Sequence, residues 1–281
     1  MKLLSSAAVR RCIVADSGYA IISSDFDQIE LRVIAALSGE PSMIDAAKRN
    51  ESLHKLAALK LFGKDYTPDE YKFAKNINFT WAYGGGPSKM ATMYHISMEQ
   101  AVAVTREYAK AFPTLVKYKS REQENVLRTA LSSSEYRLYK VLKSRMYSLR
   151  RDTTEGKIAR YEINLQIRRL LHGKLGYTYT PFGRRLVVDL DKVYACVNYK
   201  VQSTSRDIMA HALLDVMADE ELEPTVLLPI HDELLGQAPI SKAEYIAKRY
   251  GEVMSRDFMG VPITATGKVY GKSWGHGYIN K

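Results

Sequence analysis

The sequence of 281 residues is long enough for one large domain or for two lobes that share a core. Its 46% apolar and 26% charged residues are ordinary for a soluble globular protein, and no stretch is long and apolar enough for a membrane-spanning helix. The net charge of +10 indicates a polyanionic partner, either nucleic acid or an acidic membrane surface. Cys12 and Cys196 have no metal-ligand spacing, so we expect a reduced intracellular protein.

The first candidate site lies in the segment YAIISSDFDQIELRVIAALSGE. Residues 19–23 form a β-rich run, and from Gln28 apolar residues recur on one helical face until Gly39. Asp25 therefore lies where a strand passes into a helix. Carboxylate oxygens suit Mg²⁺, especially when substrate phosphates complete its ligands. The alternative is that Asp25 caps the helix, a role that Asp27 can also fill.

A second candidate site lies on a predicted helix, residues 68–83. Thr67 and Glu70 form a capping pair around Pro68, and three glycines end the helix. Side chains four residues apart form one stripe along it: Tyr71, Lys75, Phe79 and Tyr83. A lysine can hold a triphosphate as a point charge, and rings beyond it can pack against a sugar and a base. The alternative is a core stripe along which Lys75 extends its charged end to solvent.

Most of the net charge lies in one segment, residues 137–174. Eleven lysines and arginines stand there against three acids, which gives this segment +8 of the +10 of the whole chain. Basic side chains with interleaved aromatic rings suit a phosphate backbone with exposed bases. The aromatic residues among the cations are Tyr136, Tyr139, Tyr147 and Tyr161. The alternative is a solvated helical face whose tyrosines pack inward.

The last candidate site lies in TVLLPIHDELLGQAP, residues 225–239. Two apolar β runs flank the charged triplet His231-Asp232-Glu233. If the first of these strands lies beside the strand that carries Asp25, both carboxylates meet at one edge of the sheet. Two metal ions between two carboxylates can stabilise the attacking and the leaving oxygen of a phosphoryl transfer. Taken alone, the triplet is equally well explained as a polar hairpin turn.

Together these segments resemble DNA polymerase family A, the family of bacterial DNA polymerase I. DFDQIELRVIAALSGE resembles its first polymerase motif, and KNINFTWAYG resembles the second, on the nucleotide-binding finger helix. HDE after an apolar strand resembles the third. Three further segments agree: SLHKLAALKLFG, GYTYTPFGRRL and NYKVQSTSRDIMAHAL. All six stand in the order of the family, and the resemblance runs from about Arg10 to the C-terminus.

The resemblance implies a two-metal active site. Asp25, Asp232 and the backbone carbonyl of Phe26 would bind two Mg²⁺ ions, for which Mn²⁺ can substitute. The implied catalytic residues are Asp25, Asp232, Glu233 and Lys75. The residues implied to contact the incoming deoxynucleoside triphosphate are His54, Lys75, Phe79, Tyr83, Glu30 and Gln28. Among these, Glu30, fixed by Tyr83, would reject a ribose 2′-hydroxyl group.

The resemblance also implies contacts with a primer-template duplex. The residues concerned in the motifs are Arg32, Asn198, Gln202 and His231, together with Arg184 and Arg185. In the basic segment, we expect Arg145, Arg150 and Arg151 to reach backbone phosphates. The expected partners are primer-template DNA and deoxynucleoside triphosphates, with no membrane. The expected location is the cytoplasm, or the host cytoplasm if a phage encodes the chain.

Several positions depart from the pattern of the family. Tyr71 stands where the finger helix usually carries an arginine, so one implied contact with the triphosphate lacks its usual side chain. Tyr194 stands where the helix that touches the minor groove usually carries an arginine. Thr80 and Ser203 stand where glycines are usual. The chain between the second motif and the FGRR segment is also longer than the family predicts, which indicates a basic insertion at about residues 125–170 of the fingers.

The expected fold is α+β, with an antiparallel palm sheet, flanking helices and a mostly helical fingers subdomain that carries the insertion. Residues 1–42 are expected to form the first part of the palm, residues 43–190 the fingers, and residues 191–281 the second part of the palm. Only 24 residues precede Asp25, where the family has a thumb and usually an exonuclease domain. We therefore expect a fragment, one half of a split polymerase completed by a second chain, or a small enzyme whose insertion acts as the thumb.

Two other classes of protein remain open. A non-catalytic nucleic-acid-binding subunit of a replication complex would be marked by loss of an acid at the metal site, and no acid is lost. An HD-type metal phosphohydrolase is suggested by His231-Asp232. That chemistry needs an earlier histidine ligand on a helix, for which His54 is a poor candidate.

Overall fold

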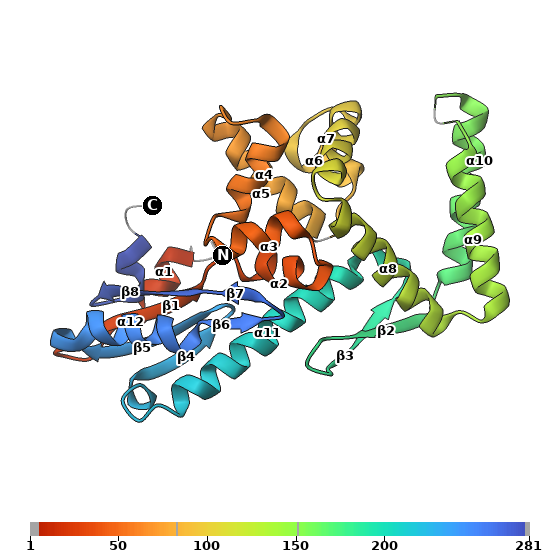
Figure 1. Cartoon of the computed structure of the whole chain (residues 1–281). Helices are drawn as coiled ribbons and strands as arrows, with labels where there is room; N and C mark the ends of the chain where they lie inside the picture. Colours follow the sequence, from red (N-terminus) through yellow and green to blue (C-terminus); the bar gives the residue numbers. More distant parts are fainter. Residues whose placement is uncertain (1–5, 83, 151, 279–281) are drawn as a thin grey trace. The chain divides into compact units, whose positions relative to one another are not determined.

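The computed structural model describes residues 6–82, 84–150 and 152–278. The chain forms two compact units, whose elements can be followed in Figure 1. The sheet unit comprises Met1–Leu56 and Gln202–Lys281, and the helical unit comprises Ala57–Val201. Within the described residues, no helix is both long enough and apolar enough to cross a membrane.

The sheet unit is built on a four-stranded antiparallel sheet in the order β4-β5-β1-β8. Its strands are β1 (Tyr19–Phe26), β4 (Val226–Ile230), β5 (Glu233–Pro239) and β8 (Ala265–Gly271), and β6 (Arg256–Phe258) pairs separately with β7 (Val261–Ile263). Its helices are α1 (Ser6–Arg11), α2 (Ile29–Ser38), α3 (Pro41–Lys48) and α12 (Ala243–Met254), with short 3₁₀ turns η2 (Glu223–Thr225), η3 (Ile240–Lys242) and η4 (Trp274–Tyr278). The antiparallel sheet with separate helices confirms the predicted α+β class.

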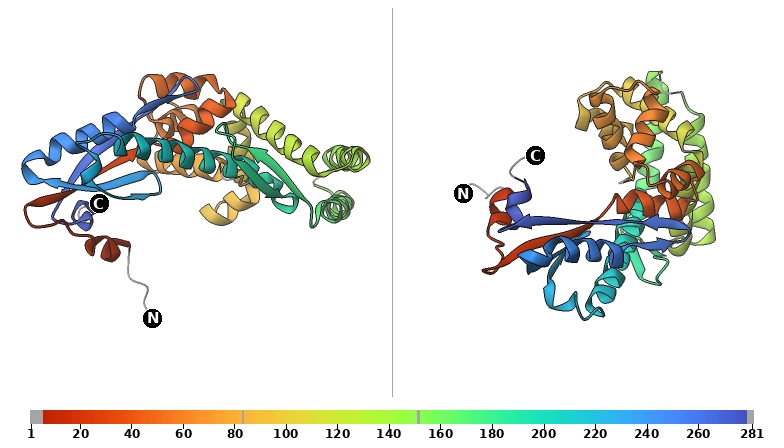
Figure 2. Two further views of the ribbon diagram at one scale, coloured as in Figure 1. Left: turned by 90° about the horizontal axis from the view of Figure 1, so that it is seen from below. Right: turned by 60° about the vertical axis from the view of Figure 1, so that its left-hand side comes forward.

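The core of the sheet unit lies between the sheet and α12. Ile21 and Ile22 on β1 are fully buried, which fits their β-branched, apolar side chains in a central strand. The helix α12 packs along β1 and β8, as the views in Figure 2 let the reader follow. It approaches β8 closely, because a Cβ atom built on Gly267 would lie 1.8 Å from the carbonyl oxygen of Ala247. A glycine is needed here so that the helix can touch the strand backbone.

The predicted start and stop of α2 are confirmed. Gln28 takes a left-handed conformation (φ 55°) before the helix, and Gly39 takes one (φ 69°) after it. Neither aspartate is the N-cap of the helix, because that position is Gln28, whose side chain makes no capping hydrogen bond. Asp25 lies within β1, and the carboxylate of Asp27 instead accepts hydrogen bonds from Thr264 and Thr266. The helix-cap interpretation of Asp25 and Asp27 is therefore wrong.

The helical unit contains six complete helices and one hairpin within the described residues. They are α5 (Pro68–Ala82), α6 (Pro87–Tyr94), α7 (Met98–Ala111), α8 (Pro113–Ala130), α9 (Ser133–Ser148) and α10 (Thr154–Leu171), then β2 (Leu175–Tyr179), β3 (Arg185–Asp189) and the 3₁₀ helix η1 (Leu190–Ala195). The strands β2 and β3 pair antiparallel. Two further helices, α4 (Leu53–Phe62) and α11 (Cys196–Met217), include residues of both units.

The helix α5 begins as the sequence predicts. Glu70 accepts a hydrogen bond from the backbone N–H of Thr67 (2.7 Å), and the Thr67 hydroxyl accepts one from the backbone N–H of Glu70 (3.2 Å). This is the reciprocal capping pair read from the sequence. The helix ends at Ala82, and Gly84 follows with a left-handed backbone (φ 74°).

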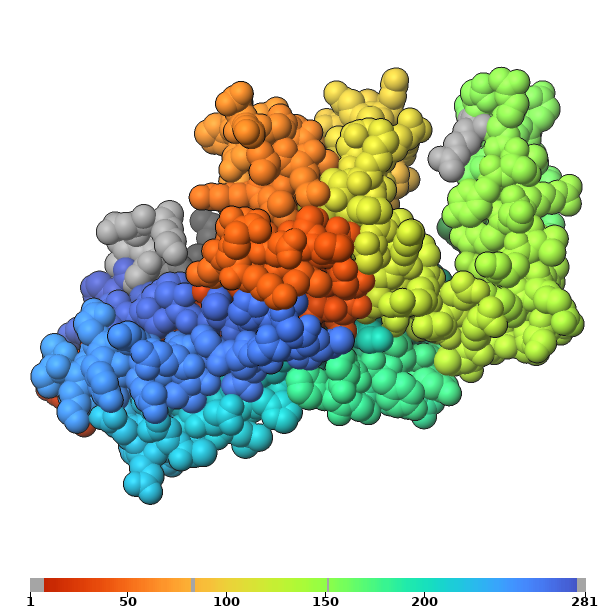
Figure 3. Space-filling model, viewed as in Figure 1, coloured from red at the N-terminus to blue at the C-terminus, as the bar shows by residue number. Residues whose placement is uncertain are grey.

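The predicted basic insertion is helical. The helices α9 and α10 pack against each other, with Leu142 and Met146 buried on α9 and Ile163 and Ile167 buried on α10. Figure 3 shows the outer surface of this helical pair open to solvent. The tyrosines of the segment do not all pack inward: Tyr147 is 64% exposed and Tyr161 is 63% exposed, whereas Tyr136 and Tyr139 are partly buried.

Candidate active site

Strand pairing brings the predicted acidic residues together at one end of the sheet. The strands β1 and β5 are antiparallel neighbours, and their register places Asp25 opposite Glu233. His231 and Asp232 form the two-residue turn between β4 and β5, with His231 in a left-handed conformation (φ 59°). The backbone N–H of Phe26 donates to the carbonyl oxygen of Asp232 (3.1 Å), which holds the turn beside the end of β1.

The carboxyl group of Asp25 lies in a strongly negative, partly buried environment. Burial raises its pKa from 3.8 to about 6, and the charges of Asp232 and Glu233 add to the increase, whereas Lys268 acts in the opposite direction. Within the turn, His231 Nδ1 lies 2.8 Å from Asp232 Oδ1, within hydrogen-bond distance. A cation between these carboxylates would offset the repulsion that adds to the raised pKa of Asp25.

Glu233 is held by two aromatic residues that sequence reasoning did not identify. The hydroxyl of Tyr270 and the indole N–H of Trp274 donate to Glu233 Oε1 at 3.3 and 3.2 Å. Both partners lie near the C-terminus, 37 and 41 residues from Glu233. No local pattern links residues so far apart, so only the folded sheet unit reveals this support.

A cavity of about 410 Å³ opens beside Asp232 in the sheet unit. Its lining residues are Glu30, Gln202, Ser205, Arg206, His231 and Asp232, of which the sequence analysis had predicted all except Ser205 and Arg206. Ser205 and Arg206 follow Gln202 on α11 by three and four residues, which places them on the same helical face. This spacing could have predicted both residues from the sequence. The Arg206 side chain is exposed and has no ionic partner among the residues described.

Three other predicted site residues of the sheet unit make internal contacts. The Gln28 side chain accepts a hydrogen bond from the backbone N–H of Leu53 (3.1 Å) at the start of α4. Arg32 is only 2% exposed and donates hydrogen bonds to four oxygens: Asp27 O, Ala47 O, Pro262 O and Asn50 Oδ1. His54 is also buried. Their implied contacts with nucleotide or DNA stay predictions.

The predicted site residues of the helical unit occupy varied positions. On α5, Lys75 is exposed and Phe79 is partly buried. Asn198 is partly buried, and its Oδ1 is enclosed without a hydrogen-bond partner. Arg184 is exposed, and the guanidinium of Arg185 lies 4.5 Å from the centre of the Tyr177 ring. Tyr83 lies outside the described residues.

The arginines proposed from the basic segment differ in their partners. Arg145 is exposed on α9. Arg150 donates two hydrogen bonds to Asp152, at 3.1 and 2.8 Å, which occupies its guanidinium group. Arg151 lies outside the described residues.

The comparisons with known proteins agree with the arrangement of strands and motifs. Residues 2–276 match the model of DNA polymerase family A. The chain is 34% identical to a DNA polymerase of Mycobacterium phage D29, over 98% of this chain and 38% of that protein. It is 27% identical to the thermostable DNA polymerase I of Thermus aquaticus, over 91% of this chain and 27% of that protein.

A solved structure shares the fold. The POL domain of Pol1 from M. smegmatis, in complex with DNA primer-template and dNTP, matches 98% of this chain and 44% of that chain, with a TM-score of 0.71 and 21% sequence identity. The chain thus spans less than half the length of each of these relatives. Because the family model matches nearly the whole sequence, this chain belongs to DNA polymerase family A.

Proposed function

We propose that the chain catalyses template-directed DNA synthesis, adding deoxynucleotides to the 3′ end of a primer by two-metal-ion phosphoryl transfer. One observation carries the proposal: the sheet register places Asp25 opposite Glu233 and beside Asp232, with the pKa of Asp25 raised to about 6. Membership of the family and the DNA and dNTP in the related structure support it.

The carboxylates fit a divalent cation. Among the residues that the structure describes, no three His, Cys, Asp or Glu side chains could hold a metal ion by themselves. A pair of aspartates suits Mg²⁺ when phosphate oxygens and water complete the ligands, and Asp25 and Asp232, with the Phe26 carbonyl, would form this set. Bound Mg²⁺, or Mn²⁺ in its place, would stabilise the attacking and leaving oxygens.

The remaining roles fall to side chains that position the substrates. Lys75, exposed on α5, would hold the triphosphate as a point charge, and Phe79 on the next turn would pack against the sugar. Glu30 lines the cavity beside Asp232, where its bulk would exclude a 2′-hydroxyl group. In the same cavity, Gln202 and Arg206 would contact the primer-template.

Neither alternative class gains support. The acids of the site are all present, so nothing marks a subunit that has lost catalysis. An HD-type phosphohydrolase needs a cluster of histidine and aspartate ligands, and the described residues hold no such group of three. The comparisons give no sign of a second chain that supplies a thumb or an exonuclease.

Primer extension with Mg²⁺ and all four deoxynucleoside triphosphates tests the proposal. Asp25→Ala and Asp232→Ala should each abolish nucleotide addition while primer-template affinity stays close to that of the parent, because each removes a metal ligand. A loss of several kcal/mol in transition-state stabilisation lowers the rate by roughly a thousandfold or more. Asp45→Asn, at an exposed acid of α3, is the matched control and should extend normally. A double variant that extends at the parental rate would refute the metal assignment.

A further inference from the structure

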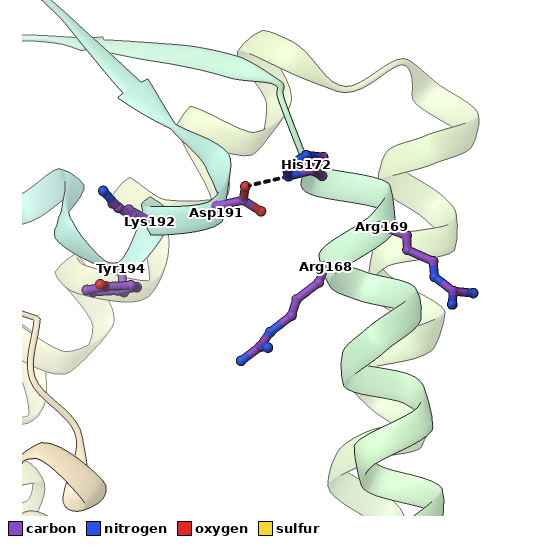
Figure 4. A pocket seen from close by; sticks show the side chains of 6 residues that line it. All are labelled: Arg168, Arg169, His172, Asp191, Lys192 and Tyr194. Carbon is purple, nitrogen blue, oxygen red and sulfur yellow. Dashed lines mark hydrogen bonds and ion pairs between the residues drawn. The ribbon is translucent and has the colours of Figure 1, made fainter.

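A second cavity, of about 670 Å³, lies in the helical unit and contains none of the residues discussed above as the active site (Figure 4). Its lining residues come from the end of α10 and from η1: Arg168, Arg169, His172, Asp191, Lys192 and Tyr194. The helix and the 3₁₀ helix are joined by a contact between His172 Nδ1 and Asp191 Oδ2 at 3.0 Å.

The cavity is cationic, and its cations are available. Within the residues described, the side chains of Arg168, Arg169 and Lys192 have no hydrogen-bond or ionic partner. Asp191 is the one carboxylate among the lining residues, and His172 already engages it. By contrast, Lys174 of the same basic segment is paired with Glu135. Unpaired cations gathered around one cavity favour a polyanion.

Helix stability explains only part of this cluster. Arg168 and Arg169 lie in the last turn of α10, where positive charge stabilises the helix dipole without any ligand. Lys192 and Tyr194 belong to η1, so that effect does not account for them. In Figure 4, Arg168 extends from α10 toward Lys192 and Tyr194, whereas Arg169 leaves the other side of the helix. The cavity therefore depends chiefly on Arg168, Lys192 and Tyr194.

Tyr194 connects the cavity to the predicted nucleotide-binding helix. Its side chain is 50% exposed, which leaves a ring face open for stacking. Its backbone touches the end of α5, because a Cβ atom built on Gly84 would lie 2.5 Å from the Tyr194 carbonyl oxygen. A strand that passes the end of α5 would meet this ring first and the two cations next.

We propose that this cavity binds the unpaired part of the template, a single strand of DNA, with backbone phosphates on Arg168 and Lys192 and one base stacked on Tyr194. The exposed ring of Tyr194 suits an unpaired base, because a base inside a duplex is stacked between its neighbours and does not offer its face. This assignment rests on the proposed function, since it places the strand relative to α5.

Fluorescence anisotropy with two labelled DNA hairpins tests the assignment, one with an unpaired 5′ template extension and one blunt. The parent should bind the extended hairpin more tightly, and the double variant Arg168→Ala/Lys192→Ala should reduce this difference, with Tyr194 retaining its part. For the extended hairpin, the slope of log affinity against log salt concentration should be smaller for the double variant than for the parent by about 1.4. This is the change expected when two phosphate contacts with a single strand are lost. Tyr194→Leu should weaken binding of the extended hairpin by about 5- to 150-fold, and Tyr194→Phe should not.

Lys157→Ala is the control, because it removes an exposed cation of α10 that does not line the cavity. It should bind both hairpins like the parent, and circular dichroism should show that all variants are folded. Equal losses on the blunt and extended hairpins would show duplex binding and overturn the assignment, as would parental binding by the double variant. Primer extension by the parent is scored separately: an inactive parent that still prefers the extended hairpin would refute the proposed function and leave the strand site standing.

Discussion

At the scale of the residue, the raised pKa of Asp25 predicts how the stability of the protein depends on pH. The native state binds the proton of this carboxyl group more tightly than the unfolded chain, because the pKa rises from 3.8 to about 6 on folding. Without metal, the contribution of Asp25 to stability therefore falls as the pH rises from about 4 to about 6. Asp25→Asn should raise the Tm in EDTA above pH 6, by on the order of a few °C, and have no such effect near pH 4.

Magnesium separates this effect from other consequences of the substitution. Thermal unfolding followed by circular dichroism at neutral pH should show that Mg²⁺ raises the Tm of the parent and leaves that of Asp25→Asn unchanged, because the ion needs the ionised carboxylate. Asp45→Asn should behave like the parent in both buffers. An Asp25→Asn protein that Mg²⁺ stabilises as much as the parent would argue against a metal at this carboxylate.

At the scale of the element, the packing of α12 on the sheet depends on one glycine of β8. Gly267 leaves no room for a side chain, since its Cβ atom would lie 1.8 Å from the Ala247 carbonyl oxygen. Gly267→Ala should push α12 from the sheet and lower the free energy of unfolding by about 1–3 kcal/mol, the usual effect of overpacking. Urea denaturation of the variant should show a lower midpoint.

Lys268→Ala provides the comparison for this substitution, because Lys268 is the next residue of β8 and its side chain is exposed. Its midpoint should stay close to that of the parent. A Gly267→Ala protein as stable as the parent would mean that α12 and β8 are not in backbone contact.

At the scale of the whole molecule, the net charge of +10 predicts DNA binding that weakens steeply with salt. The cations should not contribute equally. Arg145→Ala should flatten the plot of log affinity against log salt by about 0.9 if it loses one duplex phosphate contact. Arg150→Ala should flatten it less, because Asp152 already occupies the Arg150 guanidinium. Anisotropy titrations of duplex DNA over a range of salt concentrations provide the slopes.

Asp152→Asn serves as the control, because it removes the carboxylate that pairs with Arg150. It frees Arg150, so DNA affinity at low salt should rise above that of the parent. Equal slopes for Arg145→Ala and Arg150→Ala, with no gain from Asp152→Asn, would show that internal pairing does not decide which cations reach DNA.

The sequence by itself determined the local elements and the family. Capping residues placed the start of α5, a change of apolar period placed the passage from β1 to α2, and the charged triplet after an apolar run placed the turn before β5. These signals work because helix ends, strand runs and turns depend on residues a few positions apart. The six ordered motifs carried the resemblance that the family model confirms.

Only the tertiary structure decided how these pieces meet. The register of β1 with β5, the support of Glu233 by Trp274, and the burial of Arg32 all join residues that are distant in sequence. So does the cavity between α10 and η1, which no motif indicated. Such contacts depend on shape and burial summed over the whole fold, and a local pattern of residue types does not specify them.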